Sequence, residues 1–197
     1  QNIDGLDFQT DIPNDKIVAV HGSIGQVKCE GCGHSADFDA FCDQVQERIK
    51  DIYGENNGPK ESTFILCENC GKPLVKPSTV LFGRALPIRF FECLEHDDFD
   101  VLLVAGTSLV VSPANYVITV AGKETIRVVI NREPVGMELG IDYSGEGRDC
   151  FAQGDCEDVA LELLKELDWL DDIAVDKLPP ASADMLREAR QTAKKRE

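Results

Sequence analysis

The sequence is poor in positive charge and has no long hydrophobic stretch, and each shortage excludes a class of function. Its 197 residues include 20 lysines and arginines against 36 aspartates and glutamates, a formal net charge of −16. The phosphate backbone of a nucleic acid repels such a surface, so we expect no direct nucleic-acid partner. No apolar run approaches the length of a membrane-spanning helix, so we expect no membrane segment. The acidic surface favours basic partners, such as lysine-rich protein segments.

No segment of the sequence resembles a secretory signal, although the chain has eight cysteines. A disulfide framework needs an oxidising compartment, and a chain with 43% hydrophobic residues can form a core without such cross-links. We therefore expect reduced thiols and an intracellular location, either nuclear or cytoplasmic. Length and composition predict a globular protein of one or two domains.

Four of the cysteines form two Cys-x-x-Cys-Gly motifs. Two thiolates separated by two residues can hold one metal ion, and two such turns supply the four sulfurs of a closed tetrahedral zinc site. Gly33 and Gly71 end the motifs and allow the left-handed backbone that such a turn needs. Redox Cys-x-x-Cys motifs normally occur singly. We therefore predict one structural zinc ion, bound by Cys29, Cys32, Cys67 and Cys70.

The segment between the two motifs, residues 33–66, is longer than the roughly 15–20 residues of a common zinc ribbon. Its apolar residues recur at helical spacing, which predicts a helix with Cys42 on the buried side rather than at the metal. The apolar positions are Phe38, Phe41, Cys42, Val45, Ile49 and Ile52. We assign residues 27–76 to a zinc-binding module that contains this helical insert.

Residues 77–172 change to an α/β pattern. Val101–Ala105 is a continuous apolar run, as a strand buried on both faces requires, and Ile126–Ile130 is a second such run. A helix from Ser112-Pro113 to about residue 121 connects them, and this β-α-β unit implies parallel strands. We predict the α/β class, with an incomplete Rossmann-like, doubly wound parallel sheet into which the small zinc-binding module is inserted.

Residues 1–26 are assigned to the same Rossmann-like domain. Their apolar run, Ile17–Val20, predicts a strand that ends at His21, and Val80–Phe82 predicts another short strand after the zinc module.

The last part of the chain is predicted to contain one helix followed by a flexible tail. The helix lies near residues 157–168, and one apolar face carries Ala160, Leu163, Leu164 and Leu167. Residues 173–197 are rich in proline and charge, so we expect a loosely packed or disordered extension.

Polar and glycine residues directly follow three of the predicted strands, at His21, at Gly106–Ser108 and at Asn131–Glu133. Open α/β sheets bind ligands beyond the carboxyl ends of their strands. Small residues let a ligand approach the backbone, and a carboxylate can accept a hydrogen bond from a ribose hydroxyl. Ordinary turns use the same residues, so this pattern alone predicts no more than a nucleotide-binding α/β domain.

The order of these motifs resembles the C-terminal two-thirds of a sirtuin, an NAD-dependent protein-lysine deacylase. The resemblance covers roughly residues 1–170 and includes Gln1–Leu6, Val20–Gly22, the cysteine pairs, Val80–Gly83 with Leu86-Pro87, Gly106–Leu109 and Ile130–Glu133. It implies a reaction in which NAD and acyl-lysine give nicotinamide, deacylated lysine and O-acyl-ADP-ribose. The implied partners are acylated-lysine proteins or peptides, histone tails among them.

The resemblance also implies roles for individual residues. His21 takes the place of the family's general base, which deprotonates a ribose hydroxyl of NAD, and histidine side chains titrate near neutral pH. Three residues match the nicotinamide and ribose pocket: Gln1, Asn2 and Asp4. The residues that match the adenosine side are Gly106, Thr107, Ser108, Asn131, Arg132 and Glu133. Cys156 follows Gly154-Asp155 and matches a turn that meets the adenine ring, whereas Cys93 and Cys150 match nothing.

The substrate segment of sirtuins is matched by Val80, Leu81, Phe82 and Gly83, a strand that pairs with the peptide backbone. The sequence departs from the family pattern here, since Leu81 stands where an aromatic residue is common and Arg84 replaces a common glutamate. A cation at Arg84, beside a peptide groove, favours acidic flanking residues or acyl groups.

Two parts of the sirtuin pattern have no match in the sequence, namely the glycine-rich turn that holds the pyrophosphate and the flexible cofactor loop. We therefore expect a fragment that, on its own, binds NAD poorly and turns over little. Two alternatives stay open. One is a mono-ADP-ribosyltransferase on the same scaffold, and the other is a non-catalytic interaction module built on the zinc ribbon.

Overall fold

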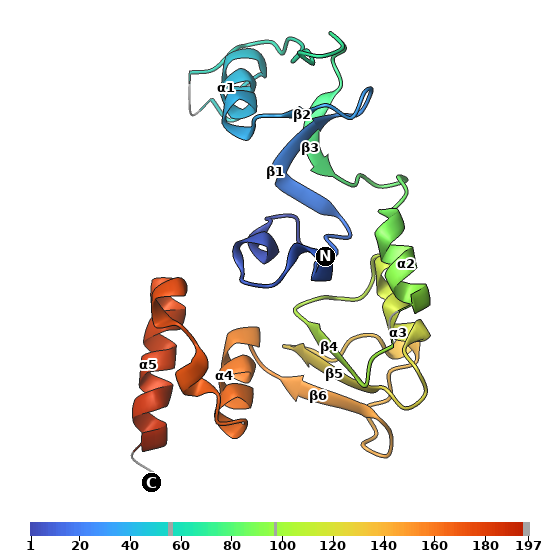
Figure 1. Cartoon of the computed structure of the whole chain (residues 1–197), viewed down its shortest axis with the longest axis vertical. Coiled ribbons are helices and arrows are strands. Elements are labelled where there is room, and N and C mark those ends of the chain that lie inside the picture. The colour runs from blue at the N-terminus through green and yellow to red at the C-terminus, as the bar shows by residue number, and fades with distance from the viewer. Residues whose placement is uncertain (55–56, 97, 195–197) are drawn as a thin grey trace. The chain divides into compact units, whose positions relative to one another are not determined.

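The computed structural model describes residues 1–54, 57–96 and 98–194, and the chain divides into two compact units (Figure 1). The first unit comprises residues 1–95 and the second residues 96–197. The predicted boundary after residue 76 does not coincide with this division, because it falls inside a strand of the first unit.

The first unit is built around a three-stranded antiparallel sheet with the strand order β2-β1-β3. The strands are β1 (Gly22–Cys29), β2 (Ser35–Ala36) and β3 (Val75–Thr79). Strand β1 pairs with β3 from Gly22 opposite Thr79 to Cys29 opposite Val75. Strand β1 therefore runs from His21 to the first cysteine motif, and β3 runs back beside it after the second motif.

Four helices complete the described part of the first unit. Two are short 3₁₀ helices, η1 (Leu6–Gln9) and η2 (Asn14–Lys16), and two are α-helices, α1 (Phe38–Arg48) and α2 (Ile88–His96). Helix α1 confirms the predicted helical insert. It begins where the Asp37 side chain accepts a hydrogen bond of 2.8 Å from the N–H of Ala40, and it ends before Ile49 and Ile52.

Two predicted strands of the first unit are wrong. Residues 17–20 form no strand, and β1 begins only after His21, because a turn closed by Gly22 N–H and the Ala19 carbonyl (2.9 Å) comes first. Strand β3 ends at Thr79, so the apolar residues 80–82 follow a strand and enter a turn. A β-strand needs a hydrogen-bonded neighbour, which an apolar run does not supply by itself.

The second unit contains the predicted parallel sheet, with the strand order β4-β5-β6. The strands are β4 (Val101–Ala105), β5 (Ile126–Asn131) and β6 (Asp149–Gln153), and both neighbouring pairs run parallel. The core packs beside the sheet and consists of Val104, Leu109, Ile118, Val129 and Ile141. The α/β class with a parallel sheet is thus confirmed.

The crossover between β4 and β5 is shorter than expected. It consists of η3 (Ala114–Tyr116) and α3 (Val117–Val120), and a further 3₁₀ helix, η4 (Met137–Leu139), follows β5. Strand β4 is also not buried on both faces, since Val101 and Leu103 are 49% and 56% exposed. Only the face that carries Val104 packs against the core.

Most of the tail that was predicted to be flexible is helical among the described residues, since α5 covers residues 180–194. Helix α4 (Cys156–Glu166) is followed by η5 (Leu170–Asp172), η6 (Val175–Lys177) and α5 (Pro180–Lys194). Leu186 of α5 is fully buried, and the Arg190 guanidinium donates to the carbonyls of Leu170 and Ile173. The predicted apolar face of α4 is less buried than expected, because Leu163 and Leu167 remain exposed.

A buried ion pair joins β5 to β6. The Arg127 guanidinium donates to both carboxylate oxygens of Asp149 at 2.5 Å, and the two side chains are only 5% and 3% exposed. Arg127 also donates to the carbonyls of Ile118 and Gly140. This one side chain therefore connects two strands, the crossover helix and the loop after η4.

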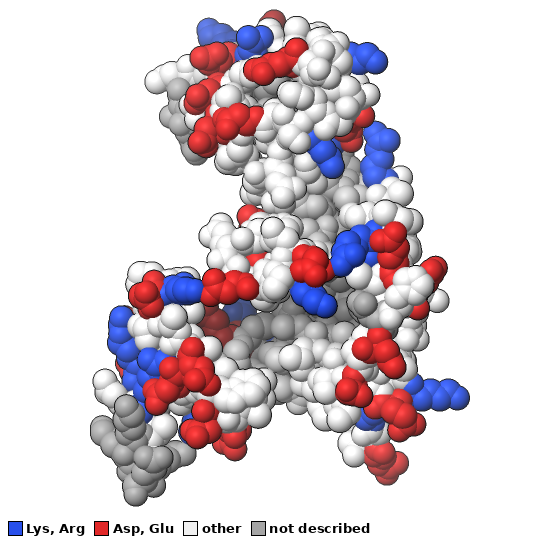
Figure 2. Space-filling model, in the orientation of Figure 1, with Lys and Arg blue, Asp and Glu red and all other residues white. Residues whose placement is uncertain are grey.

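The surface bears the acidic excess of the sequence. On the face drawn in Figure 2, acidic side chains are spread over both units, with basic side chains between them. None of the helices among the described residues is long and apolar enough to cross a membrane.

Candidate functional site

The four cysteines predicted to bind zinc meet at one point of the first unit. Their sulfur atoms all lie within 4.8 Å of one another, with Cys29–Cys70 and Cys32–Cys67 sulfur distances of 3.7 Å. A tetrahedral zinc ion with Zn–S bonds of about 2.3 Å places its ligands roughly 3.8 Å apart, so the sulfur positions fit one ion. All four positions are occupied by thiols, which makes the site closed and structural rather than catalytic.

The two cysteine motifs have the same backbone structure. In the first, Gly33 N–H donates to the Cys29 carbonyl at 2.8 Å and Cys29 N–H donates to the His34 carbonyl at 2.9 Å. The second repeats both bonds and both distances, with Gly71, Cys67 and Lys72 in the equivalent places. Gly33 and Gly71 have φ angles of 73° and 67°, as the sequence predicts for these turns.

Hydrogen bonds to sulfur favour the thiolate form at Cys32, whereas at Cys70 the backbone hydrogen bond near Lys72 is outweighed by burial and by the neighbouring thiols, which raise the pKa of Cys70 to about 11. The backbone near His34 and the Asn69 side chain, whose amide nitrogen lies 3.6 Å from the Cys32 sulfur, lower the pKa of Cys32 to about 6. The N–H of Gly31 donates to the Cys29 sulfur at 3.3 Å. Zinc binding releases the thiol protons, so these donors assist it.

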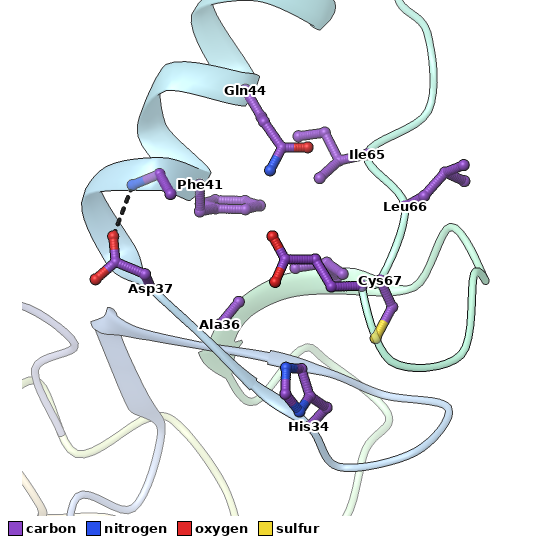
Figure 3. A pocket seen from close by; sticks show the side chains of 11 residues that line it. His34, Ala36, Asp37, Phe41, Gln44, Ile65, Leu66 and Cys67 are labelled. Carbon is purple, nitrogen blue, oxygen red and sulfur yellow. Dashed lines mark hydrogen bonds between the residues drawn. The ribbon is translucent and has the colours of Figure 1, made fainter.

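A small cavity of about 60 Å³ lies between α1 and the second cysteine motif. Figure 3 shows Phe41 and Gln44 of α1 opposite Ile65, with the Cys67 sulfur directed away from Phe41. Ile65 and Val27 are buried, so the module has an apolar core of its own beside the metal site. The helical insert thus supports the cysteine loop.

His21 is held by the start of the chain. Its Nδ1 lies 2.9 Å from the backbone carbonyl of Gln1. A carbonyl can only accept, so Nδ1 carries the proton and Nε2 of the neutral ring keeps a lone pair. That tautomer can take up a proton at Nε2, which is what a general base does.

The segment with Gln1, Asn2 and Asp4 runs beside the start of β1. The N–H of Ile24 donates to the Ile3 carbonyl at 2.8 Å, and the Asp4 carboxylate accepts from the N–H of Leu6 at 3.0 Å. The structure therefore brings the backbone of Gln1 to His21 and pairs Ile3 with Ile24 of β1, whereas no contact joins Asn2 or Asp4 to His21 among the described interactions. Gln1, Asn2 and Asp4 are exposed.

The predicted substrate segment begins at the backbone of His21. The N–H of Val80 donates to the His21 carbonyl at 2.9 Å. Leu81, Phe82 and Gly83 then form an exposed turn, closed by Arg84 N–H and the Leu81 carbonyl at 3.0 Å, and Phe82 is 97% exposed.

In the second unit, one cleft of about 650 Å³ collects the residues predicted for adenosine. It lies at the carboxyl ends of β4 and β5 and at the start of α4, where parallel sheets bind ligands. The predicted residues that line it are Gly106, Thr107, Ser108, Asn131, Arg132, Glu133 and Cys156. Asn131 joins the two strand ends, because its amide donates to the Thr107 carbonyl at 3.0 Å.

The charges of this cleft suit a neutral nucleoside better than a phosphate. Arg132 is the one cation among its lining residues, and it forms an exposed ion pair with Asp155, which raises the pKa of Arg132. Glu133 and Glu157 add two further carboxylates. Carboxylates accept hydrogen bonds from ribose hydroxyls and repel phosphates.

Two lining residues of this cleft, Val135 and Glu157, are not predicted by the sequence patterns. Val135 lies in the loop after β5 and also contacts the core, and Glu157 is in the first turn of α4. The only sequence signals for them are that Val135 follows a predicted strand and that Glu157 lies at the start of a predicted helix.

This chain belongs to the Sir2 family. The Sir2 family model matches residues 1–113, more than half of the chain. The chain is 33% identical over 190 residues to the NAD-dependent protein deacetylase hst2 of Schizosaccharomyces pombe, covering 95% of this chain and 51% of that protein. It is 37% identical over 179 residues to the NAD-dependent deacetylase sir2A of Dictyostelium discoideum, covering 86% of this chain and 32% of that protein.

A solved structure agrees with the fold. A chain described under the mechanism and regulation of Sir2 enzymes superposes with a TM-score of 0.62 at 28% identity, over 86% of this chain and 60% of the other. This chain therefore spans about half of the length of the S. pombe relative and less of the D. discoideum relative.

Proposed function

We propose that the whole protein is an NAD-dependent protein-lysine deacetylase. In this reaction an acetyl group passes from a lysine side chain to the ADP-ribose part of NAD, which releases nicotinamide, lysine and O-acetyl-ADP-ribose. The proposal rests on the position of His21. Its ring nitrogen Nδ1 is hydrogen-bonded to the Gln1 carbonyl, and its backbone carbonyl accepts a hydrogen bond from the N–H of Val80. Membership of a family with relatives named NAD-dependent deacetylases supports it.

His21 is proposed as the general base. With the proton on Nδ1, Nε2 keeps a lone pair. This lone pair can accept the proton of a ribose hydroxyl of NAD. Gln1, Asn2 and Asp4 are proposed to line the nicotinamide and ribose end of the cofactor site, because their segment runs beside His21.

The cleft at the ends of β4 and β5 is proposed to bind the adenosine half of NAD. Gly106, Thr107 and Ser108 present small side chains to the ligand, and Asn131 keeps the two strand ends together. Glu133 is proposed to accept a ribose hydroxyl, and Cys156 to contact the adenine. When NAD is bound, its ADP-ribose part is the acceptor of the acetyl group.

Val80, Leu81, Phe82 and Gly83 are proposed to bind the acetylated peptide. The segment continues from β3, an edge strand of the sheet, and edge strands bind extended peptides by strand addition. We infer acetylated proteins as substrates, histone tails among them, because the acidic surface favours lysine-rich segments. We also infer an intracellular location, nuclear or cytoplasmic, where thiols stay reduced for zinc.

The test is a product analysis of the whole protein with NAD and an acetyl-lysine peptide. Mass spectrometry should record the loss of one acetyl group from the peptide together with nicotinamide and O-acetyl-ADP-ribose. A gain of ADP-ribose on the peptide or on the protein would instead indicate a mono-ADP-ribosyltransferase. No NAD consumption, with peptide binding that is the same after His21→Ala, would indicate a non-catalytic interaction module.

A further inference from the structure

We propose that Lys76 and Arg84 form a binding site for a carboxylate of the peptide substrate, so that acidic residues beside the acyl-lysine are preferred. The inference rests on the proposed function, because it concerns the peptide bound at residues 80–83. It concerns only the residues next to the acyl-lysine, where the local cations act against the acidic net charge that favours lysine-rich proteins as a whole.

The two cations surround one carboxylate of the first cysteine motif. Lys76 Nζ lies 3.6 Å from Glu30 Oε1, and the Arg84 guanidinium lies 3.9 Å from Glu30 Oε2. Two positive charges therefore share one negative charge. These three side chains together carry a net positive charge, although the formal net charge of the chain is −16.

The ammonium of Lys76 is fixed at the end of β3. It donates to the Pro77 carbonyl at 3.0 Å and to the Thr79 carbonyl at 2.8 Å, and its side chain is 26% exposed. Its position does not depend on Glu30 alone. A carboxylate that arrives at this strand end meets a cation that is already in place.

Arg84 is free to exchange partners. Its side chain is 67% exposed, and its contact with Glu30 is a long one at an exposed surface, a kind of ion pair that contributes little to stability. A peptide carboxylate can therefore replace Glu30 at Arg84 at little cost. The guanidinium can hold such a carboxylate with two parallel hydrogen bonds.

The peptide surface next to these cations is apolar and open. Strand β3 pairs with β1 on one side only among the described strands, and Leu81 and Phe82 project from the turn that follows it. Strand addition orients a peptide along this edge. A residue one or two positions from the acyl-lysine would then lie near Lys76 and Arg84, and Asp or Glu complements their charge.

The experiment uses the whole protein and two matched acetyl-lysine peptides, one with Glu and one with Lys on both sides of the acetyl-lysine. Binding is measured by fluorescence anisotropy at low salt, and turnover by nicotinamide release. We expect the acidic peptide to bind about three- to tenfold more tightly and to have the lower KM, with similar kcat. Arg84→Glu should reverse the preference, whereas Glu30→Gln should strengthen it.

Lys60→Glu is the matched control, because it makes the same charge change on the exposed loop after α1 of the same unit. It should shift the affinities of both peptides without reversing their order. Equal affinities for the two peptides in the unchanged protein, or equal effects of Arg84→Glu and Lys60→Glu, would overturn the proposal. A preference in binding without any turnover would uphold it and count against the deacetylase function instead.

Discussion

The backbone carbonyl of His21 accepts a hydrogen bond from the N–H of Val80, with 2.9 Å between nitrogen and oxygen. The ring of the same residue is held by the Gln1 carbonyl, also at 2.9 Å. His21 therefore connects three parts of the first unit: the start of the chain, strand β1 and the proposed peptide segment. The geometry of β1 against β3 determines how the proposed base is presented to the peptide.

Gly22 is the position where this geometry is most sensitive to substitution. Its φ angle is 75°, and a Cβ added there would lie 1.9 Å from the carbonyl oxygen of Ser78 on β3. We expect Gly22→Ala to force β1 away from β3, to lower the free energy of unfolding by more than about 1 kcal/mol, and to reduce kcat. Thermal unfolding and steady-state turnover measure the two effects.

Gly25→Ala is the matched control on the same strand. An added Cβ there meets only the Ser23 hydroxyl, at 3.6 Å, which is an ordinary contact. This variant should keep both stability and kcat close to the original values. Equal behaviour of the two variants would show that the β1–β3 approach does not control the site.

Local patterns predicted the parts of the structure that depend on neighbouring residues. The spacing of the cysteines predicts the turns of the metal site, and Gly33 and Gly71 adopt the predicted left-handed conformation. Helix α1 follows the apolar repeat from Phe38, and the parallel strands β4 and β5 follow the two apolar runs. In each case the signal lies within a few residues of the element it predicts.

Contacts between distant residues could not be predicted in the same way. Strand β6 begins with Asp149, which is stable inside the protein only because Arg127 of β5 neutralises it. Helix α5 has a charged sequence, and it is held by the burial of Leu186 and by the hydrogen bond of Arg190 to the Leu170 carbonyl of η5. Residues 80–82 look like a strand, yet no strand of the described chain pairs with them. Tertiary partners decide each of these cases.

His21→Ala tests the proposed base. The variant removes the Nε2 lone pair but leaves the backbone bond to Val80, so we expect turnover to fall about 10²- to 10⁴-fold while the peptide still binds. Nicotinamide release and peptide anisotropy are the two measurements. His34→Ala is the control, since His34 lines the small cavity of the zinc module and should leave turnover nearly unchanged. Turnover retained after His21→Ala would refute the assignment.

Zinc removal should disrupt the first unit and leave the fold of the second. The four clustered sulfurs predict one zinc ion per chain by elemental analysis, and Cys32→Ser should lower that content and destabilise the module. Cys42→Ser is the matched control, because Cys42 is a half-buried thiol on α1 outside the cluster. Hydrogen exchange should show faster exchange in β1, β2 and β3 after chelation, with β4 and β5 unchanged. Equal zinc loss in both variants would contradict the assignment.

The ion pair between Arg127 and Asp149 should make the second unit sensitive to acid. The hydrogen bonds from Arg127 hold the pKa of Asp149 below its usual value, so the carboxylate stabilises the fold at any pH above the unfolded pKa of about 3.9. This stabilisation decreases as pH falls through the lower, folded pKa, because the unfolded chain takes up the proton first. Asp149→Asn should therefore weaken the dependence of unfolding free energy on pH in the acid range.

At neutral pH the same substitution should lower the free energy of unfolding by about 3–5 kcal/mol, since it leaves the Arg127 charge buried without a partner. Denaturant titration from pH 3 to pH 7 measures both effects. Asp184→Asn is the matched control, because Asp184 forms an exposed ion pair with Arg187 on α5 and should change stability by less than about 1 kcal/mol. If Asp149→Asn were as mild as Asp184→Asn, the buried pair would not be what joins β5 to β6, and the order of the sheet would have to come from the apolar core around Val104 and Val129 alone.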